Sequence, residues 1–241
     1  MSSYSVGAAY FEQIKYFIID IVRGLPIGRS TVRVALVRFD SRVEIINGFL
    51  DSLAVFTESV CNMTYPSNFG TNTGGALRTV RETVLEGREK EDGVKDVVIT
   101  ITDGMSEDPD ATKEETTLLR EQGVQLVWLY VYKVAGPIVD EKNFMDSQGD
   151  TVTWIESFRD LSDDVFWQVL EAVGAGSRTQ SCGNHGNLAP CGTTIHCFSG
   201  RDNLWKGDNC KMSYLPFAVA YQMNHFSAAV DRERCLQTSS R

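Results

Sequence analysis

The stretch DVVITITDG, residues 96–104, constrains the fold more than any other part of the sequence. Residues 97–101 are almost all β-branched and apolar, a pattern typical of a strand that is buried on both faces. The strand is followed by an acid, Asp103, and then at once by a glycine. In an open parallel α/β sheet, ligands bind at the edge formed by the carboxyl ends of the strands. The stretch therefore predicts a parallel sheet with Asp103 at its ligand-binding edge.

Apolar periodicity on both sides of this stretch predicts alternating strands and helices. We expect helices over 9–24, 53–61, 76–87, 108–122 and 165–173, and further strands over 32–39, 43–46, 124–131 and 151–155. This alternation indicates an α/β fold, with a mainly parallel Rossmann-like sheet and helices on both faces. The periodicity ends near Gly176, so we expect one domain over 1–175 and a cysteine-rich tail of unassigned fold over 176–241.

Composition limits the classes of function. The chain has 241 residues, of which 42% are apolar, and a formal net charge of −9. A general attraction to nucleic acid or to an anionic membrane is therefore not expected. No apolar run reaches the roughly 18 residues of a membrane span, and the first residues lack the basic and apolar regions of a signal peptide. The many acidic side chains instead favour a cation as a small partner.

Six cysteines, one in the first domain and five in the tail, indicate an oxidising compartment. All six are disulfide candidates, namely Cys61, Cys182, Cys191, Cys197, Cys210 and Cys235. The odd number in the tail leaves two interpretations open: Cys61 pairs with the tail, or thiols are left over. The sequon at 62–64 makes Asn62 a candidate for glycosylation. Together these features predict a secreted parent protein whose start is absent from this chain.

Three loops are expected to meet beside Asp103. The first residues bring Ser3 and Ser5, and the glycine-rich loop 66–75 brings Thr71. Hydroxyls with one carboxylate are hard oxygen donors, which suit Mg²⁺ or Mn²⁺ and leave room for a further carboxylate from a partner. No lysine follows the glycine-rich loop as a P-loop requires, so nucleotide binding is not expected.

These motifs resemble the von Willebrand factor type A domain, an adhesion module of matrix proteins and integrins, over about 1–175. The metal-ion-dependent adhesion site of that family combines Asp-x-Ser-x-Ser, Gly-x-Thr-x-Thr-Gly and Thr-Asp-Gly motifs, to which Ser3, Ser5, Thr71 and Asp103 correspond in order. The resemblance implies recognition without catalysis, in which Mg²⁺ or Mn²⁺ binds a Glu or Asp of an extracellular protein. It also implies a rim that selects the partner, formed by Tyr4, Asn68, Phe69, Met105, Glu107 and Asp108.

The chain departs from the family pattern at its start. Met1 stands where the leading aspartate belongs, and the central strand that should precede it is absent. A thioether is a soft ligand that cannot replace an acid on Mg²⁺. We therefore expect an amino-terminally truncated chain with an impaired metal site. We also expect an uncovered position in the sheet, where neighbouring strands lack a partner.

Two other functions remain open. One is a metal-independent scaffold that recognises partners through the rim and the tail, whose cysteines and aromatic residues faintly resemble a chitin-binding peritrophin-type module. The other is a hydrolase or phosphotransferase that uses Asp103 as an acid or nucleophile. It would need a second catalytic group on the same edge, and none is found, so we do not expect an enzyme. Loss of partner binding when the cation is chelated would distinguish the adhesion module from the metal-independent scaffold. Catalytic turnover would identify a hydrolase or phosphotransferase.

Overall fold

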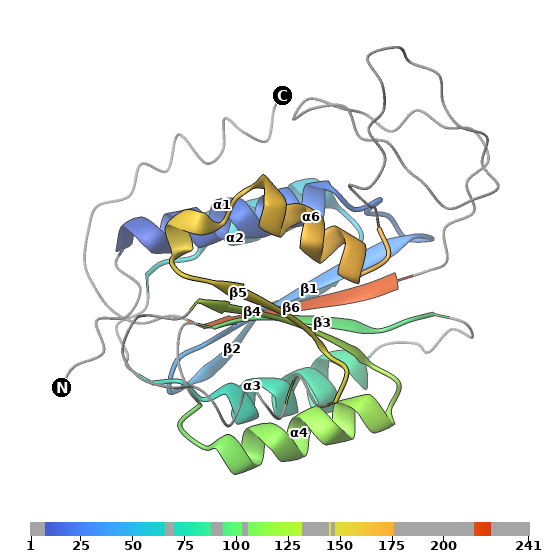
Figure 1. The fold of residues 1–241 in the computed structure, drawn as a ribbon. Helices are drawn as coiled ribbons and strands as arrows, with labels where there is room; N and C mark the ends of the chain where they lie inside the picture. The colour runs from blue at the N-terminus through green and yellow to red at the C-terminus, as the bar shows by residue number, and fades with distance from the viewer. Residues whose placement is uncertain are drawn as a thin grey trace.

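Two helical layers enclose a six-stranded sheet in the computed structural model (Figure 1). The structure describes residues 8–65, 70–87, 94–102, 106–131, 145, 148–175 and the backbone of 215–222. The strands are β1 (Val32–Phe39), β2 (Val43–Leu50), β3 (Val97–Thr102), β4 (Gln125–Val131), β5 (Thr151–Ile155) and β6 (Leu215–Gln222). The helices are α1 (Ala8–Arg23), α2 (Leu53–Asn62), α3 (Thr73–Thr79), α4 (Pro109–Glu121) and α6 (Asp163–Ala172), with a π-helical turn η1 (Val80–Leu85) and a 3-10 turn η2 (Phe158–Asp160).

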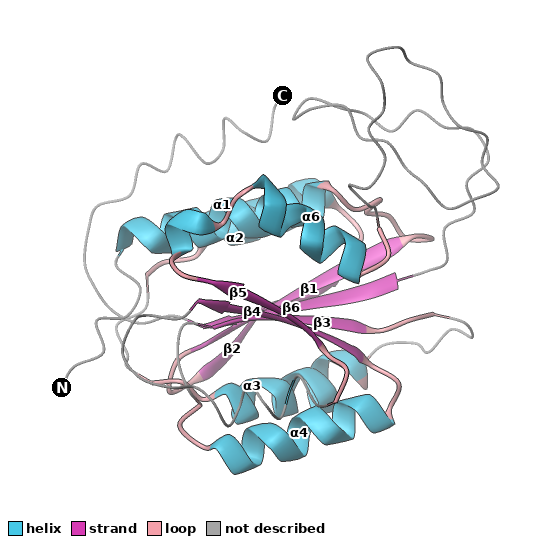
Figure 2. Ribbon diagram, viewed as in Figure 1, coloured by secondary structure: helices cyan, strands magenta, loops and turns pink. Residues whose placement is uncertain are grey.

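The order of strands across the sheet is β2-β1-β6-β3-β4-β5. All neighbours run parallel except β1 and β2, which form an antiparallel hairpin. Helices α1, α2 and α6 cover one face and α3 and α4 cover the other (Figure 2). The expected Rossmann-like α/β fold, with a mainly parallel sheet between two helical layers, is confirmed.

Strand β3 is buried along its whole length, as its β-branched sequence predicted. Ile99 and Ile101 belong to the apolar core under α1, α2 and α6. Val98 belongs to a second core under α3 and α4, together with Trp128 of β4. Because alternate residues of a strand point to opposite faces, β3 contributes apolar side chains to both cores, and the buried Thr100 and Thr102 lie on the same face as Val98.

The segment expected to be part of a separate tail contributes the central strand of the sheet. Strand β6 lies between β1 and β3 and is parallel to both. Its register runs from Val32↔Leu215 to Phe39↔Gln222 along β1, and from Val97↔Phe217 to Ile101↔Tyr221 along β3. The structure therefore differs from the expected uncovered position, because residues far along the chain fill it. A domain boundary near Gly176 remains a prediction.

Two boundaries differ by three residues or more from those expected. Strand β2 continues to Leu50, past the predicted end at Ile46, because its pairing with β1 extends to Val34↔Leu50. Helix α3 begins at Thr73, three residues before the predicted start, because the Asn72 side chain accepts a hydrogen bond from Gly75 N. This cap satisfies one of the amide groups that a helix leaves free in its first turn.

Candidate functional site

Three parallel strands bring their carboxyl ends to one edge of the sheet. β1 ends at Phe39, β6 ends at Gln222 and β3 ends at Thr102. The register pairs Phe39 with Gln222 and Ile101 with Tyr221, so the three ends lie at nearly the same level. Asp103 follows Thr102 directly in the sequence. This is the edge at which sequence analysis placed the ligand.

Thr71 lies at this edge and is 8% exposed. Its carbonyl oxygen accepts a hydrogen bond from Glu107 N at 2.9 Å. The next amide, Asn72 N, donates to the carbonyl oxygen of Asp40 at 2.8 Å. The loop of Thr71 is thus tied to the residue after β1 on one side and to the loop after β3 on the other. These two bonds fix the position of the Thr71 backbone relative to both strands.

Asp40 is a buried acid at the same edge, and sequence analysis did not include it in the site. Its carboxylate accepts a hydrogen bond from Arg42 N at 2.7 Å and one from the Ser41 hydroxyl at 3.4 Å. The signal that pointed to Asp103, an acid directly after an apolar strand, is also present at Asp40. Its carboxylate bonds organise the β1–β2 turn, so its first role is structural.

The predicted rim residues Glu107 and Asp108 are exposed at the start of α4. The Asp108 carboxylate accepts from Ala111 N at 2.9 Å and so caps this helix. Behind it, the buried Ser106 and Thr112 hydroxyls lie 2.6 Å apart and share a hydrogen bond. The loop that carries these two acids is therefore anchored at its base, while both acids face solvent.

The structure brings together only part of the predicted site. Thr71, Glu107 and Asp108 share one edge. The other predicted residues lie outside the described residues, namely Ser3, Tyr4, Ser5, Asn68, Phe69, Asp103 and Met105. Within the described residues there is no group of three or more His, Cys, Asp or Glu side chains that could hold a metal ion. A cation at this edge would therefore depend on hydroxyl donors, on Asp103 and on a partner.

Gly70 packs closely beside Thr71, and its backbone has a φ of +133°. A Cβ at this position would lie 2.8 Å from the Ser41 backbone nitrogen. We expect Gly70→Ala to lower the free energy of unfolding by about 1–3 kcal/mol, because it combines a strained φ with a collision against backbone. Chemical denaturation measures this loss.

Gly123→Ala provides the matched control. Gly123 has a φ of +80°, but a Cβ there meets no atom within 4 Å. Gly123→Ala should therefore lower the free energy of unfolding only by the strain of a positive φ, about 1 kcal/mol. Equal losses in the two variants would show that the close contact between Gly70 and Ser41 does not matter.

Two predicted modification sites lie at the end of α2. Cys61 is 6% exposed and is disulfide-bonded. Its carbonyl oxygen accepts from the buried Lys15 ammonium at 3.1 Å. Asn62 is exposed, so its glycosylation stays a prediction that the structure does not obstruct. The five cysteines of the tail lie outside the described residues.

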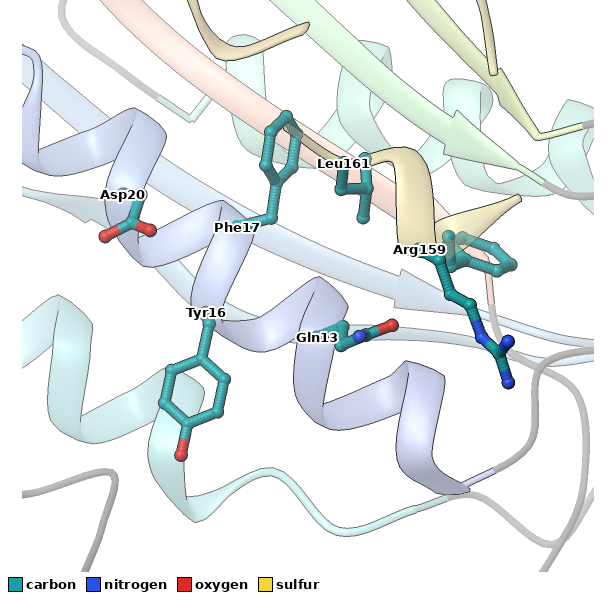
Figure 3. A pocket seen from close by; sticks show the side chains of 7 residues that line it. Gln13, Tyr16, Phe17, Asp20, Arg159 and Leu161 are labelled. Carbon is teal, nitrogen blue, oxygen red and sulfur yellow. The ribbon is translucent and has the colours of Figure 1, made fainter. Parts of the chain in front are cut away.

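A small pocket of about 180 Å³ lies between α1 and the segment around η2 (Figure 3). It is lined by Gln13, Tyr16, Phe17, Asp20, Phe158, Arg159 and Leu161. The Arg159 guanidinium lies over the ring of Tyr10, 5.7 Å from its centroid. Of the predicted site residues that the structure describes, namely Thr71, Glu107 and Asp108, none lines this pocket. Among the described residues, no helix is long and apolar enough to cross a membrane.

The sequence profile of the von Willebrand factor type A domain matches residues 2–154. The mouse collagen alpha-4(VI) chain is 31% identical over 130 residues, which cover 51% of this chain and 5% of the collagen chain. Mouse matrilin-1 is 28% identical over 163 residues, which cover 65% of this chain and 32% of matrilin-1. This chain therefore spans about a third or less of either relative.

Two solved structures are similar to this chain in fold. Proximal thread matrix protein 1 from the mussel byssus superposes with a TM-score of 0.55 at 28% identity, covering 66% of this chain and 40% of that chain. The manganese-loaded TRAP protein of Plasmodium vivax superposes with a TM-score of 0.56 over 70% of this chain and 69% of that chain. Its identity is only 14%, so this second likeness concerns the fold alone.

Proposed function

The chain belongs to the von Willebrand factor type A domain family, and from this premise we propose that it is a module for binding extracellular matrix proteins. Partner binding takes place at the carboxyl edge of the sheet. Thr71, Ser3, Ser5 and Asp103 would hold a divalent cation there, Mg²⁺ or Mn²⁺, which would supply a coordination position for a Glu or Asp of the partner. The main observation in support of the proposal is the position of Thr71. Its loop is hydrogen-bonded to the residue after β1 and to the loop after β3.

The donors proposed for this edge fit such a cation. Thr71, Ser3 and Ser5 offer hydroxyl oxygens, and Asp103 offers one carboxylate. These are hard donors, which Mg²⁺ and Mn²⁺ prefer over nitrogen or sulfur. When bound, the cation would supply a positive charge with an open coordination position for a carboxylate. Met1 stands in place of the family's leading aspartate. The site would therefore hold less negative charge than a family site with that aspartate, and it would bind the cation more weakly than such a site.

The exposed acids Glu107 and Asp108 lie beside this edge and would shape the choice of partner. Without a cation, they would repel an acidic ligand. With a cation, the same carboxylates would favour a ligand whose acidic residue is flanked by basic ones. The relatives named above include a collagen and a matrilin, which supports a matrix protein as the partner class. A secreted location agrees with that class, and chitin binding through the tail remains a separate proposal.

Removing the Thr71 hydroxyl tests the proposal. We expect Thr71→Val to weaken capture of matrix proteins by the immobilised chain about tenfold or more in Mg²⁺, because one oxygen ligand is lost. Surface plasmon resonance over a panel of purified matrix proteins, with Mg²⁺ or with EDTA, measures this. Thr117→Val is the control, because Thr117 is exposed and its hydroxyl donates to the Lys113 carbonyl oxygen within α4.

The measurement in EDTA distinguishes between the cation-dependent module and the metal-independent scaffold. Capture that disappears in EDTA supports the cation-dependent module. Capture that persists unchanged in EDTA, and in Thr71→Val, would replace it with the metal-independent scaffold. Both results are interpretable only if the two variants show the same thermal unfolding as the unmodified chain.

A further inference from the structure

Among the described strands, β6 is the sole one that pairs with both halves of the sheet. On one side of it lies the β1–β2 hairpin, and on the other lie β3, β4 and β5 (Figure 1). In this order β1 and β3 are not neighbours, and each pairs with β6 instead. Without β6, the facing edges of β1 and β3 would carry unpaired backbone amide and carbonyl groups in the middle of the sheet. The relative position of the two halves therefore depends on a strand that comes from the tail.

The ligand-binding edge spans both halves. Asp40 follows β1, and its carbonyl oxygen accepts from Asn72 N at 2.8 Å. Glu107 belongs to the loop after β3, and its amide donates to the Thr71 carbonyl oxygen at 2.9 Å. The Thr71 loop thus bridges the two halves, and α3, which starts from this loop, packs against β6. Any shift between the halves must strain or break one of these two bonds.

We propose that docking of the tail segment Leu215–Gln222 between β1 and β3 sets the geometry of the ligand-binding edge, so that binding at this edge is coupled to docking of the tail. The tail thus acts as a positioning element for the partner site, rather than as an independent module beside it. The identity of the ligand in this inference rests on the proposed function. The coupling between tail docking and the edge rests on the backbone register of β6 and on the two hydrogen bonds of the Thr71 loop.

The connectivity allows β6 to dock and undock. The strand is joined to α6 through residues 173–214, and it pairs through its backbone with β1 and β3. A disulfide between Cys61 and one of the five cysteines after residue 176 is a second link between α2 and the tail. The cost of closing a loop rises slowly with its length, so a long connection neither prevents docking nor enforces it. Local opening of single elements below the free energy of global unfolding is a general property of folded domains. A terminal strand reached by a long connection is a candidate for such an opening.

Native-state hydrogen exchange of the unmodified chain tests the coupling without any variant. The inference predicts that the amides of Asn72 and Glu107 exchange in the same opening as the amides of β6, with the same dependence on denaturant. The amides of β4, which does not touch β6, should exchange in a later and larger opening. If Asn72 and Glu107 stay protected while β6 opens, the coupling is refuted.

A proline in β6 provides the functional test. Ala218 pairs with Ala35 on one side and Val98 on the other. Ala218→Pro removes a backbone donor from a central strand, where proline is not tolerated. Exchange at Asn72 and Glu107 should become at least tenfold faster, while β4 stays protected, and Mn²⁺ affinity should fall at least tenfold. Ala218→Gly keeps the donor and should leave both measurements near those of the unmodified chain.

The two readouts separate this inference from the proposed function. An unmodified chain that does not bind Mn²⁺ would contradict the cation site but would leave the exchange result as the test of coupling. An Ala218→Pro chain with unchanged exchange at Asn72 and Glu107 would contradict the coupling, whatever its Mn²⁺ affinity. If the proline unfolds the whole chain, the native-state experiment on the unmodified protein decides.

Discussion

Replacement of Glu115 by alanine is expected to lower the free energy of unfolding by about 2–3 kcal/mol, because it removes a buried carboxylate that accepts charged hydrogen bonds from two arginines. Glu115 lies in α4 and is only 1% exposed. Its carboxylate accepts from Arg81 Nε at 2.8 Å and from Arg78 Nε at 2.7 Å. Arg81 is largely buried, whereas Arg78 is half exposed. Because solvent screens the interaction between Arg78 and Glu115, most of the lost stability should come from the interaction between Arg81 and Glu115.

This ion pair matters for the candidate site because it joins α4 to α3 and η1. Helix α3 begins two residues after Thr71, and α4 begins just after the exposed acids of the rim. Urea denaturation of Glu115→Ala measures the loss. Glu114→Ala is the control, because Glu114 is its exposed neighbour on the same helix and should change stability by less than about 0.5 kcal/mol. A loss below about 1 kcal/mol in Glu115→Ala would contradict the assigned role.

The same carboxylate makes a pH-dependent contribution to stability. Burial raises the pKa of Glu115, but the hydrogen bonds and charges of Arg81 and Arg78 lower it more, so its pKa lies below its ordinary value of 4.5. A carboxyl whose pKa is lower in the folded state stabilises the protein above its unfolded pKa. That contribution should be lost as the pH falls from about 4.5 through the folded pKa. Glu115→Gln should remove this part of the acid sensitivity.

Local patterns in the sequence were sufficient to predict most of the α/β framework. The β-branched run before Asp103 could form only a strand buried on both faces, and β3 is such a strand. Helix α4 was bounded by its own capping chemistry, with Asp108 at the start and Gly123, at a φ of +80°, just past the end. These signals are local, so they do not depend on the rest of the chain.

The place of β6 could not be predicted in the same way. Its sequence, LPFAVAYQ, is a short apolar run with a proline near its start, in a segment without periodicity. Only the facing edges of β1 and β3 make it a central strand, and that is a property of tertiary structure. Sequence analysis placed the missing strand before α1, as in the family, and did not consider a strand from the far end of the chain.

The candidate site was predictable only in outline. Sequence analysis expected Thr71, Glu107 and Asp108 at the carboxyl edge of the sheet, and they lie there, but binding at this edge stays a prediction. The structural role of Asp40 was missed, because its hydrogen bonds to the β1–β2 turn and to Asn72 depend on how the loops fold against each other. The same is true of Asn72, which caps α3 although Thr71 and Thr73 are equally good candidates by residue type.

Among the proposed ligands, Asp103 is the one whose replacement is expected to lower the affinity for the cation most. It provides the sole carboxylate of the proposed ligand set, since Ser3, Ser5 and Thr71 are neutral. Asp103→Asn keeps the shape and an oxygen donor but removes the charge. Because a divalent cation is held mainly by charge, Mn²⁺ affinity should fall about tenfold to a hundredfold. Asp110→Asn is the control, because Asp110 is an exposed acid in the first turn of α4 with no proposed role as a ligand.

A Mn²⁺ titration of the unmodified chain and of Asp103→Asn, followed by the electron paramagnetic resonance signal of free Mn²⁺, tests the central claim most directly. The account predicts saturable binding at one site in the unmodified chain and in Asp110→Asn, and a much weaker isotherm in Asp103→Asn. Absence of saturable binding in the unmodified chain, or equal isotherms for all three proteins, would contradict a cation site at the carboxyl edge of this sheet.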